Sequence, residues 1–237
     1  MSIKGIIFDK DGTLMKFDEF WLPAARAAAE TILRDLGCGE DAAEDMLRAA
    51  GAYDGIRGSL CSGTYADIAD AFGGVIKKSC GRPVPDNMEE ITRGAFEKST
   101  DRGKIVPACG DIKGVLDRLK KKGISLFLVT TDGYDITKKC LGGLGITGCF
   151  DGIYTDDGEG KTKPDPYYIY QIEKEFGFAP DELIMVGDTL TDMEFAKNGG
   201  IAAAGAAVSD EDKEILKKDA AVVIDDISQL EGITDEI

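Results

Sequence analysis

The sequence predicts an α/β fold, a doubly wound Rossmann-like parallel sheet with an inserted all-helical domain. Two observations lead to this prediction. Short apolar runs bounded by turn residues alternate with segments of helical periodicity over most of the chain. Between residues 16 and 100 the alternation stops, and helical periodicity continues without a convincing strand. A crossover between parallel strands needs only about a dozen residues, so this long helical stretch is interpreted as a second domain.

The alternating part of the chain yields six strands and five helices. The expected strands are residues 3–8, 124–130, 150–155, 183–186, 201–203 and 220–224. The expected helices are residues 111–122, 134–141, 166–176, 191–198 and 210–217. Because strand and helix follow each other repeatedly, the sheet is expected to be parallel and covered by helices on both faces.

The inserted stretch has the apolar spacing of a helical domain. From Trp21 to Leu36 apolar residues recur every three to four positions, and Gly37 ends the run. Further helices are expected at residues 41–50, 64–72 and 86–96. We therefore expect a core made of residues 1–15 and 101–237 and a helical domain made of residues 16–100.

The composition excludes several classes of function. The 237 residues carry 28 Lys and Arg against 44 Asp and Glu, a formal charge of −16, which argues against a nucleic acid or an anionic membrane as a partner. The chain has no histidine, which excludes Ser-His-Asp and Cys-His catalysis and His-ligated zinc. Catalysis would have to rest on carboxylates, lysine, hydroxyls, thiols or a bound metal.

Cysteine spacing and hydropathy predict the compartment. The six cysteines form no C-x-x-C pair, which is typical of reduced thiols. No apolar run approaches the roughly 20 residues of a membrane span, and the apolar stretch near Met1 is too short for a signal sequence. A cytoplasmic protein is therefore expected.

Acidic residues follow two of the expected strands. Asp9 and Asp11 come directly after the first strand, while Asp188 follows the fourth and Asp192 lies one helical turn later. In an open parallel sheet, ligands bind beyond the carboxyl ends of the strands. Carboxylates gathered there would repel one another unless a hard cation lay among them, and oxygen ligands suit magnesium.

A hydroxyl and an ammonium group are expected at the same edge. Thr130 ends the second strand, and Lys163 precedes a Pro-Asp-Pro run before a helix. Lys161 lies two residues earlier and competes for the same role. The crevice would then hold acidic groups together with one hydroxyl and one cation.

These residues form four short motifs in a fixed order. The motifs are Asp9-Lys10-Asp11-Gly12-Thr13, Thr130, Lys163-Pro164 and Gly187-Asp188-Thr189-Leu190-Thr191-Asp192. Together they resemble the four motifs of the haloacid dehalogenase-like (HAD) superfamily. The insertion resembles the helical cap of the phosphoglycolate-phosphatase-like branch of that family. Any one motif alone is weak, whereas four in order over the whole chain are specific.

The resemblance implies a role for each matched position. Asp9 would be the nucleophile that forms an aspartyl-phosphate, and Asp11 would be the general acid and then the general base. Thr130 and the Thr131 backbone would donate hydrogen bonds to the phosphoryl oxygens, and Lys163 would neutralise their charge.

The resemblance also implies a magnesium ion. Its ligands would be Asp9, the backbone carbonyl of Asp11 and Asp188, with Asp192 in support.

Taken alone, Asp9 and Asp11 could be a solvated turn, since Asp-x-Asp-Gly is common turn chemistry. A calcium loop is excluded because glycine falls at the fourth loop position and Phe20 at the twelfth. The Asp192 carboxylate could cap a helix, which is compatible with a supporting role at the metal.

The expected activity is a magnesium-dependent phosphatase for a small phosphorylated metabolite, either phosphoglycolate-like or a sugar phosphate. In the helical domain, Arg57 lies in a glycine-rich stretch and could pair with a substrate carboxylate, although a surface arginine is an equal alternative. A phosphomutase resembling beta-phosphoglucomutase and a non-catalytic phospho-ligand binder are the alternative functions. A dehalogenase is disfavoured, because dehalogenases of the family lack the second acid that Asp11 provides. No nucleic acid or membrane is expected as a partner, and the protein is expected to be a monomer or a homodimer.

Overall fold

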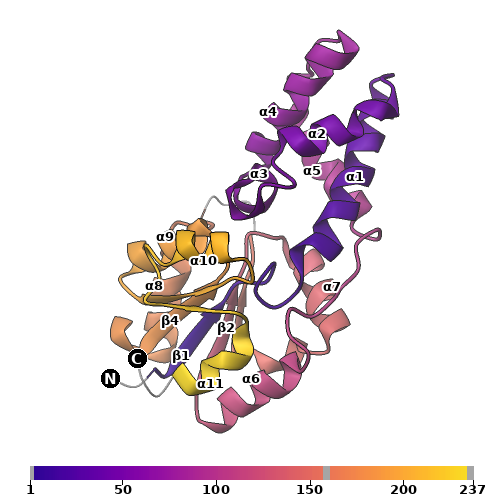
Figure 1. The fold of residues 1–237 in the computed structure, drawn as a ribbon. Coiled ribbons are helices and arrows are strands. Elements are labelled where there is room, and N and C mark those ends of the chain that lie inside the picture. Colours follow the sequence, from indigo (N-terminus) through magenta and orange to yellow (C-terminus); the bar gives the residue numbers. More distant parts are fainter. Residues whose placement is uncertain (1–2, 157–160, 234–237) are drawn as a thin grey trace. The chain divides into compact units, whose positions relative to one another are not determined.

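The computed structural model describes residues 3–156 and 161–233. The chain divides into two compact units (Figure 1). One unit consists of Met1–Lys16 and Ile105–Ile237, and the other consists of Phe17–Lys104. The first unit is an α/β structure and the second is helical, so the predicted fold class is confirmed.

The α/β unit is built on one sheet whose paired strands all run parallel. Its strand order is β3-β2-β1-β4-β5-β6. The strands are β1 (Gly5–Phe8), β2 (Ser125–Val129), β3 (Gly152–Tyr154), β4 (Leu183–Gly187), β5 (Ala202–Ala206) and β6 (Val222–Ile224). The chain winds outward from β1 to β3, returns to the centre at β4 and winds outward to β6. The direction therefore reverses between β1 and β4, which is where an open α/β sheet opens a ligand crevice.

Helices cover both faces of this sheet (Figure 1). They are α6 (Ile112–Lys121), α7 (Tyr134–Leu144), α8 (Tyr167–Phe176), α9 (Leu190–Gly199), α10 (Asp210–Leu216) and α11 (Leu230–Ile233). On one face, Phe8 and Leu128 share an apolar core with Leu116 of α6. On the other face, the ring of Phe127 meets that of Phe176 in α8 at a centroid distance of 4.7 Å. Since neighbouring strand residues alternate between the faces, all of β1 is buried.

The helical unit has an apolar core of its own. Its helices are α1 (Phe17–Asp35), α2 (Ala43–Ala49), α3 (Ser59–Ser62), α4 (Tyr65–Val75) and α5 (Met88–Ser99). Phe96 of α5 packs against Trp21 of α1 and Phe72 of α4, with ring centroids 6.2 and 6.3 Å apart. The four predicted helices of this stretch are present, each with bounds shifted by a few residues.

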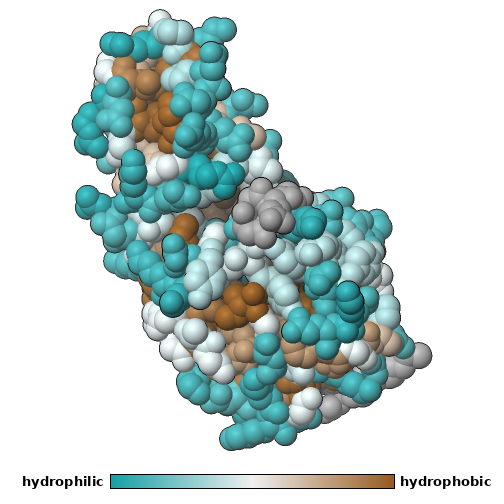
Figure 2. Space-filling view, turned by 180° about the vertical axis from the view of Figure 1, so that it is seen from behind, coloured by the Kyte–Doolittle hydropathy of each residue, from teal (hydrophilic) through white to brown (hydrophobic). Residues whose placement is uncertain are grey.

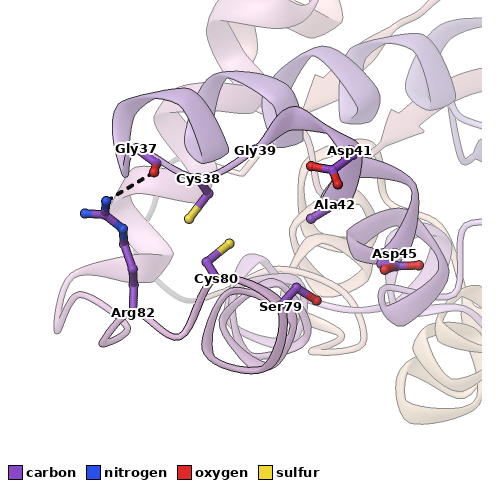
Figure 3. Close-up of a pocket in the computed structure, with 9 residues that line it drawn as sticks. All are labelled: Gly37, Cys38, Gly39, Asp41, Ala42, Asp45, Ser79, Cys80 and Arg82. Atoms are coloured by element: carbon purple, nitrogen blue, oxygen red, sulfur yellow. Dashed lines mark hydrogen bonds between the residues drawn. The ribbon is translucent and has the colours of Figure 1, made fainter.

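A cavity of about 430 Å³ opens within the helical unit. Its lining residues are Gly37, Cys38, Gly39, Asp41, Ala42, Asp45, Ser79, Cys80 and Arg82. The thiols of Cys38 and Cys80 point toward each other across it, and Arg82 donates a hydrogen bond to the carbonyl of Gly37 (Figure 3). All six cysteines of the chain are free thiols, as predicted. None of the predicted site residues lines this cavity.

Hydrophilic residues cover most of the face seen in Figure 2, and hydrophobic residues reach that surface in separate patches. This surface agrees with a chain in which 30% of the residues are charged. Within residues 3–156 and 161–233, no helix has the length and apolar character needed to span a bilayer.

Candidate active site

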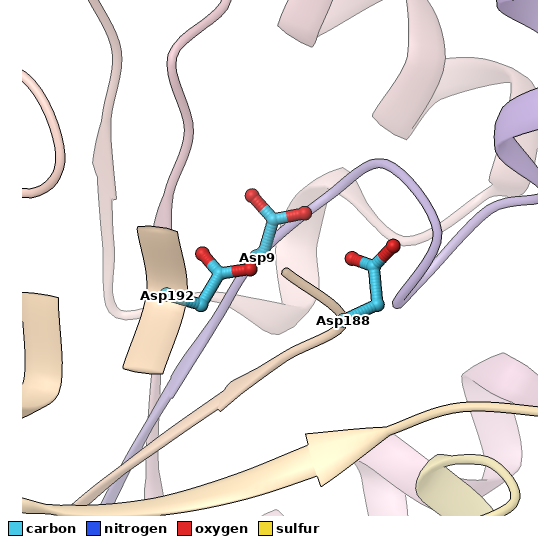
Figure 4. Close-up of side chains that lie close together, drawn as sticks. All are labelled: Asp9, Asp188 and Asp192. Atoms are coloured by element: carbon cyan, nitrogen blue, oxygen red, sulfur yellow. The ribbon is translucent and has the colours of Figure 1, made fainter. Parts of the chain in front are cut away.

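Three carboxylates converge at the carboxyl edge of the central strands (Figure 4). Asp9 follows β1 and Asp188 follows β4. These strands pair in register, so both residues emerge at the same edge of the sheet. Asp192 reaches the same place from the first turn of α9. Carboxylate oxygens of the three residues, here called the acidic cluster, lie within 4.8 Å of one another, and all three residues are buried.

The turn after β1 requires a glycine beside this cluster. Gly12 has φ +81°, a conformation that residues with a side chain rarely adopt. A Cβ atom at this position would lie 1.9 Å from Oδ2 of Asp188. The hydroxyl of Thr13 donates a hydrogen bond of 3.1 Å to Oδ1 of Asp188. The Gly-Thr pair thus lets the turn approach Asp188 and orient its carboxylate.

Asp192 uses its two oxygens for two purposes. Oδ2 accepts hydrogen bonds from the backbone N–H of Thr189 at 3.1 Å and from its hydroxyl at 2.7 Å. The Thr189 hydroxyl accepts the N–H of Asp192 in return, which completes a capping box at the start of α9. Oδ1 accepts a hydrogen bond from Lys163. The helix cap and the acidic cluster therefore share one carboxylate.

Lys163 is the cation of the cluster. Its buried ammonium lies 2.5 Å from Oδ1 of Asp9 and 2.6 Å from Oδ1 of Asp192. Burial opposes the charged form, but the two carboxylates raise the pKa of Lys163 above its ordinary value. Lys161, the competing residue, is exposed and lies over the ring of Tyr167, 4.3 Å from its centroid.

The acidic cluster carries more negative charge than Lys163 balances. Burial raises the pKa of Asp9 to about 7, and repulsion from Asp192 adds to this shift against the opposing effect of Lys163. Burial, together with repulsion from Asp9 and Asp192, raises the pKa of Asp188 well above its ordinary value. When all three carboxylates are ionised, as they would be around a bound cation, they carry two negative charges more than the one ammonium group balances. Hard oxygen donors with this excess fit a divalent cation such as Mg²⁺.

Asp11 does not join the acidic cluster through its side chain. Its carboxylate Oδ2 lies 2.5 Å from Nζ of Lys10, and Oδ2 of Asp132 lies 2.9 Å from the same nitrogen. Burial opposes the charge of Lys10, but Asp11 and Asp132 raise its pKa above the ordinary value. Burial raises the pKa of Asp132 to about 6, with Lys10 acting against this shift.

Lys10 and Asp132, which surround the Asp11 carboxylate, were not predicted as site residues. Lys10 could have been noticed because it stands between two aspartates directly after a fully buried strand. Asp132 could have been noticed because it lies two residues beyond Thr130.

The remaining predicted residues lie in different surroundings. Thr130 is buried beyond β2, where its N–H donates to the carbonyl of Tyr154 and its hydroxyl oxygen accepts the N–H of Asp132. Thr131 is exposed. Arg57 is also exposed and belongs to the helical unit, at the end of the short 3₁₀ helix Gly55–Arg57. Its predicted contact with the substrate stays a prediction.

Comparison with known proteins identifies the family. Residues 3–200 match the model of the haloacid dehalogenase-like hydrolases. The chain belongs to this family. The match covers every residue of the acidic cluster and confirms the resemblance seen in the four motifs.

Two curated relatives are similar to this haloacid dehalogenase-like hydrolase over most of its length. Pyrophosphatase PpaX of Bacillus velezensis is 30% identical over 206 residues, which cover 86% of this chain and 83% of the relative. A phosphoglycolate phosphatase of Thiobacillus denitrificans is 33% identical over 203 residues, which cover 84% of this chain and 81% of the relative. Among solved structures, a predicted phosphoglycolate phosphatase from Haemophilus somnus superimposes with a TM-score of 0.72 at 20% identity, covering 98% of both chains. That structure supports the fold.

Proposed function

We propose that this hydrolase is a magnesium-dependent phosphatase that cleaves a small organic phosphomonoester through an aspartyl-phosphate on Asp9. The observation that carries the proposal is the place of the Asp9 carboxylate, at the edge of the central strands and paired with the buried ammonium of Lys163. The two curated relatives, named as a pyrophosphatase and a phosphoglycolate phosphatase, support phosphoryl chemistry.

In the first half-reaction Asp9 is the nucleophile. A carboxylate oxygen forms a bond to phosphorus while the bond between phosphorus and the leaving oxygen breaks. Lys163, already in contact with Asp9, stabilises the charge of the phosphoryl oxygens in the transition state. The hydroxyl of Thr130 and the backbone of Thr131 donate hydrogen bonds to the same oxygens.

Asp11 handles the protons of both half-reactions. Its carboxyl group gives a proton to the leaving oxygen, so that the alcohol departs neutral. In the second half-reaction the same group takes a proton from water. The water oxygen then bonds to phosphorus, the bond to Asp9 breaks, and inorganic phosphate is released with Asp9 and Asp11 restored.

Asp9, Asp188 and the backbone carbonyl of Asp11 would hold the magnesium ion, with Asp192 in support. When bound, the ion supplies positive charge that offsets the repulsion between the Asp9 carboxylate and the phosphate. The two excess negative charges of the acidic cluster support this assignment.

For the substrate we propose a phosphoglycolate-like compound or a sugar phosphate, with Arg57 pairing with a substrate carboxylate in the first case. A phosphomutase of the beta-phosphoglucomutase type would use the same Asp9 chemistry and return the phosphoryl group to a sugar hydroxyl. A screen of phosphorylated metabolites that measures both free phosphate and isomer formation separates these two outcomes.

The Asp9→Asn variant tests the proposal. We expect phosphate release to fall by at least about 10³-fold, because the amide cannot attack phosphorus. We also expect the wild type, but not Asp9→Asn, to show an acid-stable mass increase of one phosphoryl group after rapid quenching. Asp181→Asn, which changes an exposed aspartate of the same unit, is the control and should behave like the wild type. Normal phosphate release by Asp9→Asn would remove Asp9 as the nucleophile.

A further inference from the structure

Lys10, Asp11 and Asp132 form a second charged group, which we call the Lys10 triad. Nζ of Lys10 lies 2.5 Å from Oδ2 of Asp11 and 2.9 Å from Oδ2 of Asp132. The Lys10 side chain is fully buried, so it does not reach a substrate. The chemistry proposed above uses Asp11 and gives Lys10 and Asp132 no part.

Stability alone gives no reason for a lysine at this position. Removing an ammonium group from water costs several kcal/mol, and buried ion pairs can often be replaced by apolar residues without loss of stability. Lys10 directly follows Asp9 at the end of a strand whose residues are all buried, where an apolar side chain would avoid this cost. The contact between Lys10 and a reacting carboxyl group offers a functional reason instead.

We propose that Lys10 and Asp132 are positioning residues that hold the Asp11 carboxyl group for its two proton transfers. This inference rests on the proposed function, in which Asp11 gives and takes those protons. Lys10 binds Oδ2 of Asp11, whereas Oδ1 is buried and has no hydrogen-bond partner among the residues that the structure describes. Lys10 therefore holds one oxygen of Asp11, and the other has no described protein partner that would compete with the leaving group or with water.

The backbone of Lys10 is fixed as firmly as its side chain. Its carbonyl accepts the N–H groups of Leu14 at 2.9 Å and Met15 at 3.1 Å. The N–H of Gly12 donates to the carbonyl of Met15 at 2.7 Å and closes the turn that carries Asp11. Because both ends of the Lys10 side chain are held, the ammonium group defines where the Asp11 carboxyl group can lie.

Asp132 connects this turn to the loop that would bind the phosphoryl group. Its N–H donates to the hydroxyl oxygen of Thr130 at 3.2 Å, and its carboxylate lies beside Lys10. Lys10 thus links the turn after β1 to the loop after β2 through Asp11 and Asp132. Two carboxylates against one ammonium leave one negative charge, the same as Asp11 alone. Lys10 and Asp132 together therefore orient Asp11 without adding net charge beside it.

Two variants and two kinds of substrate test the proposal. Lys10→Met removes the ammonium group, and Asp132→Asn keeps the shape of the side chain while removing its charge. Lys120→Met is the matched control, because Lys120 forms a half-exposed ion pair with Asp151 at 2.8 Å in the same unit. The substrates are an alkyl phosphate taken from the metabolite screen and 4-nitrophenyl phosphate. Nitrophenolate is a good leaving group and departs without a proton. An alkoxide is a poor leaving group and needs a proton from a general acid.

We expect kcat/KM for the alkyl phosphate to fall at least about tenfold more than kcat/KM for 4-nitrophenyl phosphate in both triad variants, since general acid catalysis contributes 10²–10⁴-fold. With 4-nitrophenyl phosphate we also expect a rapid release of one equivalent of nitrophenolate followed by a slower phase. This burst would arise because a misplaced Asp11 activates water poorly. The Lys120→Met variant should show neither effect.

Equal losses on both substrates, or no loss, in a folded Asp132→Asn protein would overturn the proposal. If circular dichroism shows that Lys10→Met has not folded, Asp132→Asn decides by itself. A wild-type protein that cleaves neither ester would overturn the proposed function and this inference with it. Wild-type turnover that depends on Asp9, combined with unselective triad variants, would overturn this inference alone.

Discussion

Two buried lysines at the same edge of the sheet are held in different ways. Lys163 lies between Asp9 and Asp192, both of which belong to a cluster of three carboxylates. Lys10 lies between Asp11 and Asp132. With every carboxylate ionised, the first group has two negative charges in excess and the second has one. The difference indicates that the surroundings of Asp9 can accept further positive charge, whereas the charges around Asp11 are nearly balanced.

Lys163 and Lys10 also differ in their sequence separation from the carboxylates that they contact. Lys163 is separated from Asp9 by 154 positions, so only the fold joins them. Lys10 is the sequence neighbour of Asp11. Loss of Lys163 should therefore disturb charge at the reacting centre directly, while loss of Lys10 should act through the placement of one side chain.

The largest effect in this comparison is expected for Lys163→Met. We expect kcat to fall by about 10²–10³-fold, the cost of removing one preorganised group that stabilises transition-state charge. The free energy of unfolding should also fall, by about 3–5 kcal/mol, because the buried carboxylates lose their only ammonium partner within the cluster. Steady-state phosphate release and urea denaturation measure the two quantities.

Lys161→Met is the matched control for this experiment. Lys161 is exposed and contacts the ring of Tyr167, an interaction worth about 0.5–1 kcal/mol at such sites. Its loss should leave kcat unchanged. If Lys161→Met and Lys163→Met lost the same fraction of kcat, Lys163 would not be the group that stabilises transition-state charge.

A smaller effect is expected for magnesium and the Asp188→Asn variant. The ion should raise the melting temperature of the wild type, because it relieves the repulsion of the acidic cluster. At a free concentration of about 100 times Kd, this corresponds to about 2.7 kcal/mol. In Asp188→Asn the affinity measured by calorimetry should fall at least about tenfold.

The Lys10→Met variant sharpens this metal test. The metal assignment uses the backbone carbonyl of Asp11 but no side chain of the Lys10 triad, so the variant should keep a magnesium-dependent rise in melting temperature. An unchanged melting temperature of the wild type with magnesium and with chelator would contradict the metal assignment.

The smallest effect is expected at the capping boxes. Thr189→Ala and Thr64→Ala remove the same type of cap, at the start of α9 and α4 respectively. Each should cost about 1 kcal/mol in the free energy of unfolding. Only Thr189→Ala should also reduce kcat, because its partner Asp192 contacts Lys163. Equal activity of the two variants would show that the cap at α9 serves stability alone.

Much of the fold could be predicted because the strands are short buried runs with clear ends. The segment 183–186 became β4 with one additional residue, Gly187, and Asp188 emerges where the motif order predicted. The helix α11 was not predicted, since its four residues are too short for a periodic pattern. Strand β3 is shorter than expected, because only Gly152–Tyr154 pair with β2.

The candidate site could be predicted less completely. The motifs locate Asp9, Lys163, Asp188 and Asp192, but spacing does not show where a side chain points. The place of Asp11 in one crevice with the others stays a prediction, and the spacing did not show that its carboxylate pairs with Lys10. Asp132 lies within two residues of Thr130 and has no pattern of its own, so only the three-dimensional structure reveals its contact with Lys10.

The helical insertion enters the chain only after the turn that carries Asp9 and Asp11 is complete. Every carboxylate and ammonium group of the two charged groups comes from the α/β unit, and the helical unit packs around its own aromatic residues. The segment from Phe17 to Lys104 can therefore vary in sequence without replacing any charged side chain of these two groups.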